Sequence, residues 1–313
     1  MDPVLHILTG YTSVGKTRLS LDWAKQNQAE IISCDSLLFY RHMDIGTAKP
    51  SRGEMAEVTH HMIDVTNVSE QYSINEYVRQ VKDVAADIYS RGKQVLVVGG
   101  SGFYLNAFFA PVVDGLSLEP AVQRRIEHQF ENQPLSDSVA VLRTLNPHGL
   151  GDLDVANPRR VLKAWLRCLA SGKTLEQLKQ EFGARAGAFD QFEKRLIVLS
   201  RAREELEERV RIRVDAMLSA GLVEEVRQLL SLGIERNPSA AGAIGYRETI
   251  AFLRGDLPES KLAENITRNT RKLLKKQRTW FKKFLPHGAV YDISSLEKLP
   301  GLWHRLPKSK STP

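Results

Sequence analysis

The sequence predicts a doubly wound parallel α/β sheet that carries a helical insertion. Three observations support this fold class. A glycine-rich segment, Gly10-Tyr11-Thr12-Ser13-Val14-Gly15-Lys16-Thr17, has the spacing G-x-x-x-x-G-K-[ST]. Short segments that are apolar throughout alternate with helical patterns, as in a parallel sheet covered on both faces. After about residue 115 only helical patterns follow, until a further apolar strand near residue 196.

The glycine-rich segment has the context of a P-loop, so the core is expected to be P-loop NTPase-like. The apolar run 4–8 before it has the length of a strand, and residues 18–25 after it read as a helix. Such a loop turns backbone N–H groups and a helix N-terminus toward one point, where an anion binds favourably. Lys16 would reach the terminal phosphate, and Thr17 would offer its hydroxyl to Mg²⁺. The alternative is a glycine-rich turn that binds nothing.

The remaining elements follow from periodicity and capping signals. Ser73 and Glu76 form a capping box that opens a helix ending near Gly92. Further strands are expected at 30–33, 60–64, 94–98 and 196–199, and residues 37–59 are expected to be mostly loop. Helices are expected at 120–132, 135–145, 157–171, 174–182, 203–219, 222–232, 244–254 and about 259–285.

The switch from alternating strands and helices to helices alone predicts two domains. Residues 1–115 and 195–313 would form the P-loop catalytic core with C-terminal basic helices, and residues 116–194 a helical insertion domain. The last residues, 307–313, are expected to form a disordered tail.

Composition excludes several classes of protein. The 313 residues are 42% apolar and 26% charged, which is ordinary for a globular protein, and no apolar run has the length of a membrane span. Cys34 and Cys168 suggest neither a disulfide framework nor a metal cluster. We therefore expect a cytoplasmic protein without a membrane partner.

The positive charge is concentrated in one segment. The formal net charge is 44 − 37 = +7, yet residues 261–283 alone hold nine basic residues against Glu264. That segment carries 9 − 1 = +8, so the remainder carries −1. Its apolar residues fall near one stripe that would dock on the core, and the cations spread over the rest. This pattern favours contact with RNA or DNA phosphates over a membrane surface.

Asp35 is the best candidate for a catalytic carboxylate. It follows the strand 30–33, and ligands of open parallel sheets bind beyond the carboxyl ends of strands, where the P-loop also lies. It can accept a proton from a nucleophile or cap a helix. The strand 94–98 ends in Gly99-Gly100, so the second acid of a nucleotide hydrolase is missing unless Asp64 replaces it.

Two other groups of residues have weaker chemical signals. Arg209 and Arg213 lie one turn apart on the helix after the last core strand, where one could reach a diphosphate or both could pair with neighbouring glutamates. His60 and His61 would point to opposite faces of a strand, which argues against a shared metal.

Together these motifs resemble the tRNA dimethylallyltransferase (IPP transferase) family over nearly the whole chain. The resemblance rests on the P-loop and on the segments that follow it. These are Asp35-Ser36, Tyr40-Arg41, Met43 to Pro50, His60 to Asp64, Gly99 to Tyr104, Asn157 to Arg160, Ala243 to Glu248 and Lys276 to Phe281. The run from Met43 to Pro50 is the most specific of them.

The resemblance implies prenyl transfer to N6 of an adenosine next to the anticodon (position 37) of tRNA. Asp35, Ser101, Lys16 and Thr17 would be catalytic, with Mg²⁺ on Thr17. Residues 10–17 with Arg209 and Arg213 would bind the diphosphate of dimethylallyl diphosphate. The tRNA anticodon stem-loop would be bound by Asp35, Ser36, Leu37, Leu38, Ser101, Arg159, Arg160, Lys163, Arg271, Lys272, Lys275 and Arg278. The protein is expected to be a monomer.

Some residues depart from the family pattern. Tyr11 replaces a proline, Ser101 a threonine and Lys163 an arginine. Leu38 replaces a glutamine that meets the target nucleotide, and leucine cannot hydrogen-bond a base edge. The alternatives are a P-loop small-molecule kinase, a prenyltransferase acting on free adenine nucleotides, and a non-catalytic RNA-binding protein.

Overall fold

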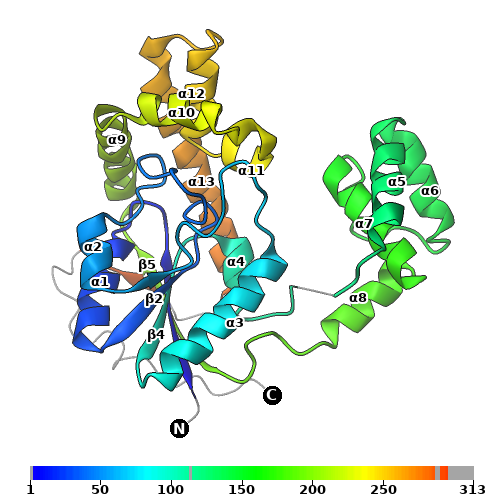
Figure 1. Cartoon of the computed structure of the whole chain (residues 1–313), viewed down its shortest axis with the longest axis horizontal. Helices are drawn as coiled ribbons and strands as arrows, with labels where there is room; N and C mark the ends of the chain where they lie inside the picture. Colours follow the sequence, from blue (N-terminus) through cyan, green and yellow to red (C-terminus); the bar gives the residue numbers. More distant parts are fainter. Residues whose placement is uncertain (1–2, 113–114, 286–289, 295–313) are drawn as a thin grey trace. The chain divides into compact units, whose positions relative to one another are not determined.

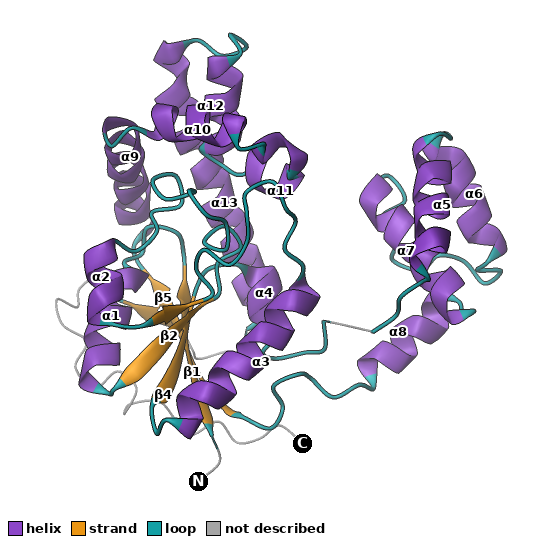
Figure 2. Ribbon diagram, viewed as in Figure 1, coloured by secondary structure: helices purple, strands orange, loops and turns teal. Residues whose placement is uncertain are grey.

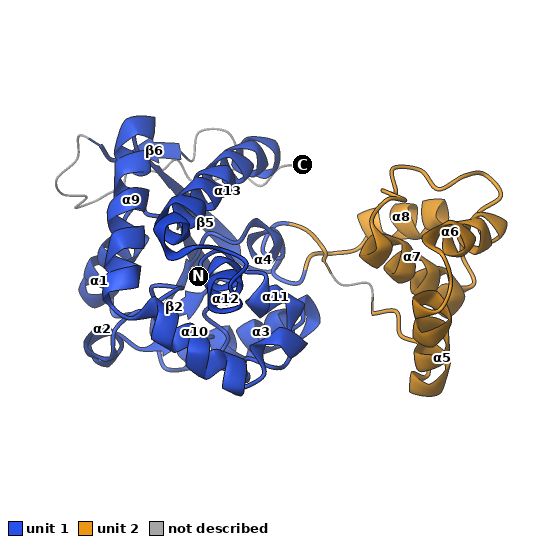
Figure 3. Ribbon diagram, turned by 90° about the horizontal axis from the view of Figure 1, so that it is seen from above, with its two compact units in different colours: residues 1–109, 188–313 blue, residues 110–187 orange. Residues whose placement is uncertain are grey.

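The computed structural model describes residues 3–112, 115–285 and 290–294, and the chain forms two compact units (Figure 3). The first unit comprises residues 1–109 and 188–313, and the second residues 110–187. The second unit begins and ends earlier than the sequence pattern placed the insertion. The reason is that Phe189 stacks on Phe108 with ring centroids 4.7 Å apart, which anchors the returning chain in the first unit.

The first unit is built on a parallel sheet that has six strands within the described residues. The strand order is β3-β2-β4-β1-β5-β6. Every neighbouring pair is parallel, and β1 has β4 on one side and β5 on the other. The strands are β1 (Val4–Gly10), β2 (Ala29–Ser33), β3 (His60–His61), β4 (Gln94–Val98), β5 (Glu193–Ser200) and β6 (Val290–Asp292). The central strands are almost fully buried, which explains why most of their residues are apolar.

Helices cover both faces of this sheet, with α1 on one side and α3 on the other (Figures 1 and 2). The helices up to α4 are α1 (Lys16–Gln26), α2 (Arg52–Glu57), α3 (Ile74–Ser90) and α4 (Gly102–Asn106). After β5 come α9 (Arg203–Ser219), α10 (Leu222–Ser231), α11 (Pro238–Ala241), α12 (Tyr246–Leu253) and α13 (Leu262–Phe284), with short 3-10 turns η1 (Ile234–Arg236) and η2 (Glu259–Lys261). α10, α12 and part of α9 and α13 share a separate core around Tyr246 and Val210.

The second unit is wholly helical in its described part. Its helices are α5 (Pro120–Glu131), α6 (Leu135–Thr144), α7 (Pro158–Ser171) and α8 (Leu175–Gly183). They enclose a small core around Trp165, Leu142 and Ile126. Asn157 caps α7, since its side chain accepts a hydrogen bond from the backbone N–H of Arg160.

The expected elements agree closely with those observed, with a few differences. α2 lies in a stretch expected to be loop, and it forms because Ser51 and Glu54 make a reciprocal capping box. β6 had no strand signal in the sequence, and residues 307–313 lie outside the described part. Within the described residues, no helix is long and apolar enough to cross a membrane.

Candidate active site

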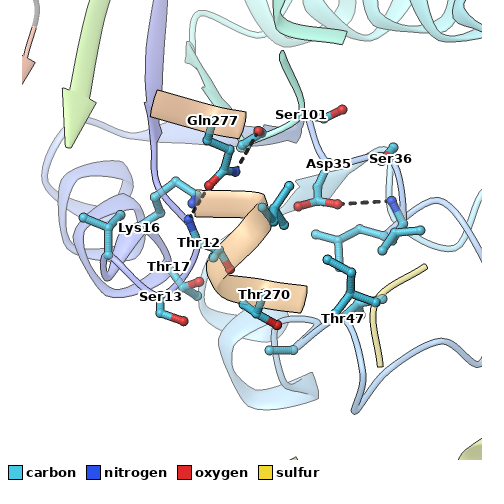
Figure 4. A pocket seen from close by; sticks show the side chains of 18 of the residues that line it. Thr12, Ser13, Lys16, Thr17, Asp35, Ser36, Thr47, Ser101, Thr270 and Gln277 are labelled. Atoms are coloured by element: carbon cyan, nitrogen blue, oxygen red, sulfur yellow. Dashed lines mark hydrogen bonds between the residues drawn. The ribbon is translucent and has the colours of Figure 1, made fainter. Parts of the chain in front are cut away.

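A large cavity opens where the strands of the first unit end. Its volume is about 1280 Å³, and its lining comes from segments far apart in the sequence. They are the P-loop (12–17), the turn after β2 (35–38), the loop residues 46–48, the segment 99–103 after β4, and side chains of α9 and α13. Figure 4 shows Lys16, Asp35, Ser101 and Gln277 facing this space. The carboxyl edge of the sheet is therefore the candidate site, as expected for a doubly wound fold.

The P-loop adopts the conformation expected of an anion cradle. Gly15 precedes α1 with φ 104°, a left-handed conformation that favours glycine. The Lys16 ammonium donates to the carbonyl oxygens of Gly10 (3.0 Å) and Tyr11 (2.9 Å), which hold the lysine in place. Gly10 and Tyr11 themselves are not part of the cavity lining. Thr12 to Thr17 line the cavity.

Lys16 is poised between two charges. Burial lowers the pKa of its ammonium group to about 8; the nearby Asp35 carboxylate opposes this shift, and the Arg213 guanidinium adds to it. A lysine held in this way gains most from an anion that supplies the missing negative charge. The electrostatics therefore support binding of a phosphate group at Lys16.

Asp35 lies two residues beyond the end of β2. Its Oδ1 accepts a hydrogen bond from the backbone N–H of Leu37 at 3.1 Å, which fixes the carboxylate at the cavity wall (Figure 4). It does not cap a helix, because 36–39 form a turn. Asp35 and Glu54 are the carboxylates among the lining residues, and Glu54 is already engaged in the capping box of α2. Asp35 is therefore the carboxylate available for proton transfer.

Arg209 and Arg213 of α9 donate to loop carbonyl oxygens, whereas Arg203 and Arg211 pair with glutamates of their own helix. Arg209 Nε donates to the carbonyl oxygen of Ser13 at 2.7 Å, and Arg213 donates to that of Thr47 at 3.0 Å. Burial lowers the pKa of Arg213, and Asp35 opposes that shift. Both arginines line the cavity beside the P-loop, and their role in binding a diphosphate stays a prediction.

The carboxylate of Glu225 in α10 holds the loop at Met43 to Pro50, the segment most specific to the family pattern. Glu225 accepts hydrogen bonds from the backbone N–H groups of Asp44 (3.0 Å), Ile45 (2.6 Å) and Gly46 (3.1 Å). It also accepts one from the hydroxyl of Tyr246 at 2.7 Å. A side chain at Gly46 would clash with the Tyr246 ring, because a Cβ there would lie 2.5 Å from it. No sequence signal identified Glu225.

α13 contributes to the cavity wall instead of only docking on the core. Gln277 donates to the carbonyl oxygen of Gly100 at 3.2 Å and accepts the N–H of Thr12 at 3.0 Å (Figure 4). Thr270, Leu273 and Trp280 line the cavity on the same side of the helix. Phe284, one of the apolar residues of this helix expected to dock on the core, is 47% exposed and lines the cavity.

The cations expected to contact RNA lie on the outer surface of α13. Arg271, Lys272, Lys275 and Arg278 are all exposed and none belongs to the cavity lining. Arg271 Nε lies 3.8 Å from Glu207 of α9. The helix therefore presents a cationic surface outward and a polar and aromatic face to the cavity.

The other residues expected to meet the target nucleotide line the cavity. They are Ser36, Leu37, Leu38 and Ser101. Ser101 precedes α4, and its N–H donates to the carbonyl oxygen of Cys34 at 3.4 Å. Its side chain makes no capping hydrogen bond with α4. Leu38 presents an apolar side chain where a glutamine was expected from the family pattern.

The residues that could have indicated other chemistry have structural partners. Asp64 pairs with Lys49 at 2.6 Å and is not a lining residue, so it does not replace a hydrolase acid. His61 lies 2.7 Å from Glu30, and His60 Nδ1 lies 2.7 Å from the carbonyl oxygen of Val58. Within the described residues, no three metal-binding side chains of the His, Cys, Asp or Glu type cluster.

Arg159, Arg160 and Lys163 belong to the second unit. All three lie in the first turns of α7 and are exposed. Arg160 Nη1 is 3.9 Å from Asp154 Oδ2, a loose surface pair. They form a cationic surface at the start of α7, which remains a prediction as an RNA contact.

The fold and cavity define a P-loop α/β enzyme that presents a carboxylate opposite the cradle but lacks the second acid of a nucleotide hydrolase in its described lining. Comparison with known proteins gives the family. The family model "IPP transferase" matches residues 38–284. This chain belongs to the IPP transferase family.

Similar proteins cover nearly the whole chain. It is 52% identical to the tRNA dimethylallyltransferase of Opitutus terrae, over 96% of this chain and 97% of that protein. It is 36% identical to that of Clostridioides difficile, over 95% and 94%. The structure of a tRNA isopentenylpyrophosphate transferase from Bacillus halodurans aligns with a TM-score of 0.66 at 29% identity, covering 94% of this chain and 90% of the other.

A structure of a eukaryotic dimethylallyltransferase acting on tRNA aligns with a TM-score of 0.77 at 25% identity, covering 94% of this chain and 75% of the other. These relatives are prenyl-transferring enzymes of tRNA, and the chain is accordingly an enzyme of the prenyltransferase class.

Proposed function

We propose that this enzyme transfers a dimethylallyl group from dimethylallyl diphosphate to N6 of adenosine 37, next to the anticodon of tRNA. The observation that supports this most directly is the placement of Lys16 and Asp35 in one cavity. The cradle around Lys16 suits a diphosphate, and Asp35 suits an incoming amine. The names of the similar proteins agree with this reaction.

The proposed reaction is a single displacement. A bond forms between the adenine N6 and the allylic carbon, and the bond from that carbon to the diphosphate oxygen breaks. The electron pair of the broken bond leaves with the diphosphate, and the proton released from N6 passes to Asp35. Asp35 would act as the general base, since the N6 lone pair is delocalised into the ring and makes the amine a poor nucleophile.

The cradle would stabilise the leaving group. Negative charge grows on the diphosphate as the carbon–oxygen bond breaks, and preorganised donors lower the energy of that charge. The Lys16 ammonium, the N–H groups of Ser13, Gly15, Lys16 and Thr17, and Arg209 or Arg213 would stabilise this charge, since these residues line the cavity. Ser101 would hold the diphosphate or the base from the opposite wall.

Mg²⁺ fits the donor set, and we propose Thr17 as its protein ligand. Thr17 is exposed at the cavity beside the cradle, and Asp35 is in the same lining. Mg²⁺ typically binds few protein oxygens together with substrate phosphates, so a hydroxyl and a diphosphate suffice without an acidic cluster. When bound, the ion would neutralise charge on the diphosphate.

The partner would be the anticodon stem-loop. The exposed cations Lys272, Lys275 and Arg278 of α13 would bind backbone phosphates, and Arg159, Arg160 and Lys163 would contact the same RNA from the second unit. The target base must leave its stack to reach the cavity, which costs little in a single-stranded loop. We expect the chain to act as a monomer in the cytoplasm.

The test is incubation with bulk tRNA and labelled dimethylallyl diphosphate, followed by nucleoside analysis. We expect the label in N6-dimethylallyl adenosine. Label on free adenine nucleotides instead of RNA, or consumption of ATP without RNA, would contradict the proposal and favour a nucleotide prenyltransferase or a kinase. A matched reaction with tRNA whose target adenosine is replaced by guanosine should stay unlabelled.

A further inference from the structure

Exposed apolar side chains gather at the candidate site. Phe103 (60% exposed) and Phe284 (47% exposed) are among the most exposed large apolar residues in the described chain, and both line the cavity. They come from α4 and from the last turn of α13. Exposed aromatic rings that border a cavity usually mark a binding surface. These two rings therefore indicate that a ligand binds beside the P-loop cavity.

Trp280 lies beside both segments that carry these rings. Its ring lies against the backbone of Gly102, where a Cβ would be only 2.6 Å from it. It also stacks on Phe284 with ring centroids 5.1 Å apart and an interplanar angle of 28°. Phe103 meets Tyr104 edge to face at 5.6 Å, and Tyr104 is buried. We call Phe103, Trp280 and Phe284 the aromatic wall.

Two lysines lie beside the aromatic wall. Lys276 lines the same cavity, and the Lys283 ammonium lies 5.1 Å from the centre of the Phe284 ring. Aromatic faces beside lysine ammonium groups match a nucleic-acid strand, whose bases stack while its phosphates pair with the cations.

We propose that the aromatic wall is a stacking site for an unpaired nucleobase that flanks the reacting adenosine. This inference rests on the proposed function, because it places a neighbour of the reacting base in the cavity that also holds Asp35. The flanking base would stack on Phe103 or Phe284, and that contact would keep the reacting base out of the RNA stack.

The other candidate occupant is the dimethylallyl chain. That chain has five carbons and gains from a surface that encloses it and excludes water. Rings that are 60% and 47% exposed do not enclose a group of that size. A nucleobase, with a wide planar face and a polar edge left in water, suits them better.

The test uses an anticodon stem-loop RNA with 2-aminopurine in place of one base beside the target adenosine, on each side in turn. We expect binding to the enzyme to change the fluorescence at one of the two positions. Phe103→Ala or Phe284→Ala should abolish that change and weaken RNA binding about five-fold or more. The KM for dimethylallyl diphosphate at saturating RNA should stay within about two-fold of the parent value.

Two variants serve as controls. Phe103→Tyr keeps an aromatic face and should retain RNA affinity and the fluorescence change. Leu232→Ala removes an exposed apolar side chain (49% exposed) outside the cavity and should change neither quantity. Thermal melts of each variant check that the fold is kept.

Each other outcome has a definite meaning. A raised KM for dimethylallyl diphosphate with unchanged RNA affinity would assign the wall to the prenyl chain and overturn the inference. Unchanged RNA affinity and KM in both alanine variants, or no fluorescence change in the parent enzyme, would also overturn it. A parent enzyme that neither binds the RNA nor prenylates it would instead contradict the proposed function itself.

Discussion

Gln277 joins α13 to the P-loop: its Oε1 accepts the backbone N–H of Thr12 at 3.0 Å across 265 positions of sequence. The same amide donates to the carbonyl oxygen of Gly100 at 3.2 Å. One side chain thus links the loops that follow β1 and β4 to the helix that carries the exposed cations. The helix expected to bind RNA therefore also fixes the loop expected to bind diphosphate.

Replacing Gln277 by leucine should weaken the cradle. The change removes two hydrogen bonds, each worth about 0.5–1.5 kcal/mol. We expect the KM for dimethylallyl diphosphate to rise about ten-fold while RNA affinity stays near the parent value. Steady-state kinetics with each substrate varied separately provide the measurement. Thr279→Val, on the exposed side of the same helix, is the control, and an unaltered KM in Gln277→Leu would remove the side chain from this role.

Asp35→Asn should abolish most turnover while leaving RNA affinity nearly intact. Asparagine has nearly the same shape, and its side-chain oxygen can still accept the Leu37 N–H, but it cannot take a proton. Loss of a general base costs about 100-fold or more in kcat. Single-turnover kinetics and a filter-binding titration measure the two effects. Asp83→Asn, on the exposed face of α3, is the matched control, and near-normal turnover in Asp35→Asn would assign proton transfer elsewhere.

The affinity for dimethylallyl diphosphate in the absence of RNA should fall as the pH rises through about 8. Because the pKa of Lys16 is lowered to about 8, its ammonium is charged below that pH and loses its proton above it. The free energy of unfolding should change in the opposite direction and rise with pH. Burial in the folded state disfavours the charged ammonium, so the full destabilisation is present below about pH 8. It disappears above the pKa of the unfolded chain, near 10.4.

Calorimetric titrations between about pH 7.5 and about pH 9.5 would measure the affinity change, in a range where the substrate's own phosphate is already ionised. Lys16→Arg keeps a positive charge throughout this range. Its affinity, whatever its absolute value, should be nearly independent of pH. A parent enzyme with an equally flat profile would mean that Lys16 stays charged or does not contact the ligand.

Neutralising Lys272, Lys275 and Arg278 together should weaken RNA binding and reduce its dependence on salt. Each phosphate contact that is lost means that about one counterion fewer is released on binding. The magnitude of the slope of log K against log salt should therefore decrease by about two to three. Titrations of the stem-loop at several salt concentrations measure it. A triple variant of the exposed Arg52, Arg79 and Lys82 removes equal charge elsewhere on the same unit. Equal effects in both triple variants would point to general electrostatic attraction, and no effect in the α13 variant would move the RNA site.

Glu225→Ala should destabilise the protein and lower its activity. The change leaves the N–H groups of Asp44, Ile45 and Gly46 without their acceptor, at a cost of about 2–3 kcal/mol in the free energy of unfolding. The loop also positions the Thr47 carbonyl oxygen that holds Arg213. Urea unfolding and kcat measure the two effects. The neighbouring Glu224 pairs with Arg227 at the surface, so Glu224→Ala should cost at most about 1 kcal/mol. Equal losses in both variants would refute the loop-holding role.

Local chemistry explains which elements could be predicted. The capping box at Ser73 and Glu76 marked α3 correctly, and the apolar runs marked β1, β2, β4 and β5. β6 was missed because its three residues are too few to show a strand pattern. The second unit starts and ends a few residues earlier than the sequence pattern indicated, and the contact between Phe189 and Phe108 that holds the returning chain has no periodic signal.

The sequence by itself determined the cradle, since the spacing of Gly10, Gly15, Lys16 and Thr17 requires only neighbouring residues to form it. It also determined the position of Asp35 at the sheet edge, because parallel strands end on the same side. Only the tertiary structure decided which side chains complete the cavity. Gln277, Glu225 and the aromatic wall act across separations that no local pattern records, because each depends on where a distant helix packs.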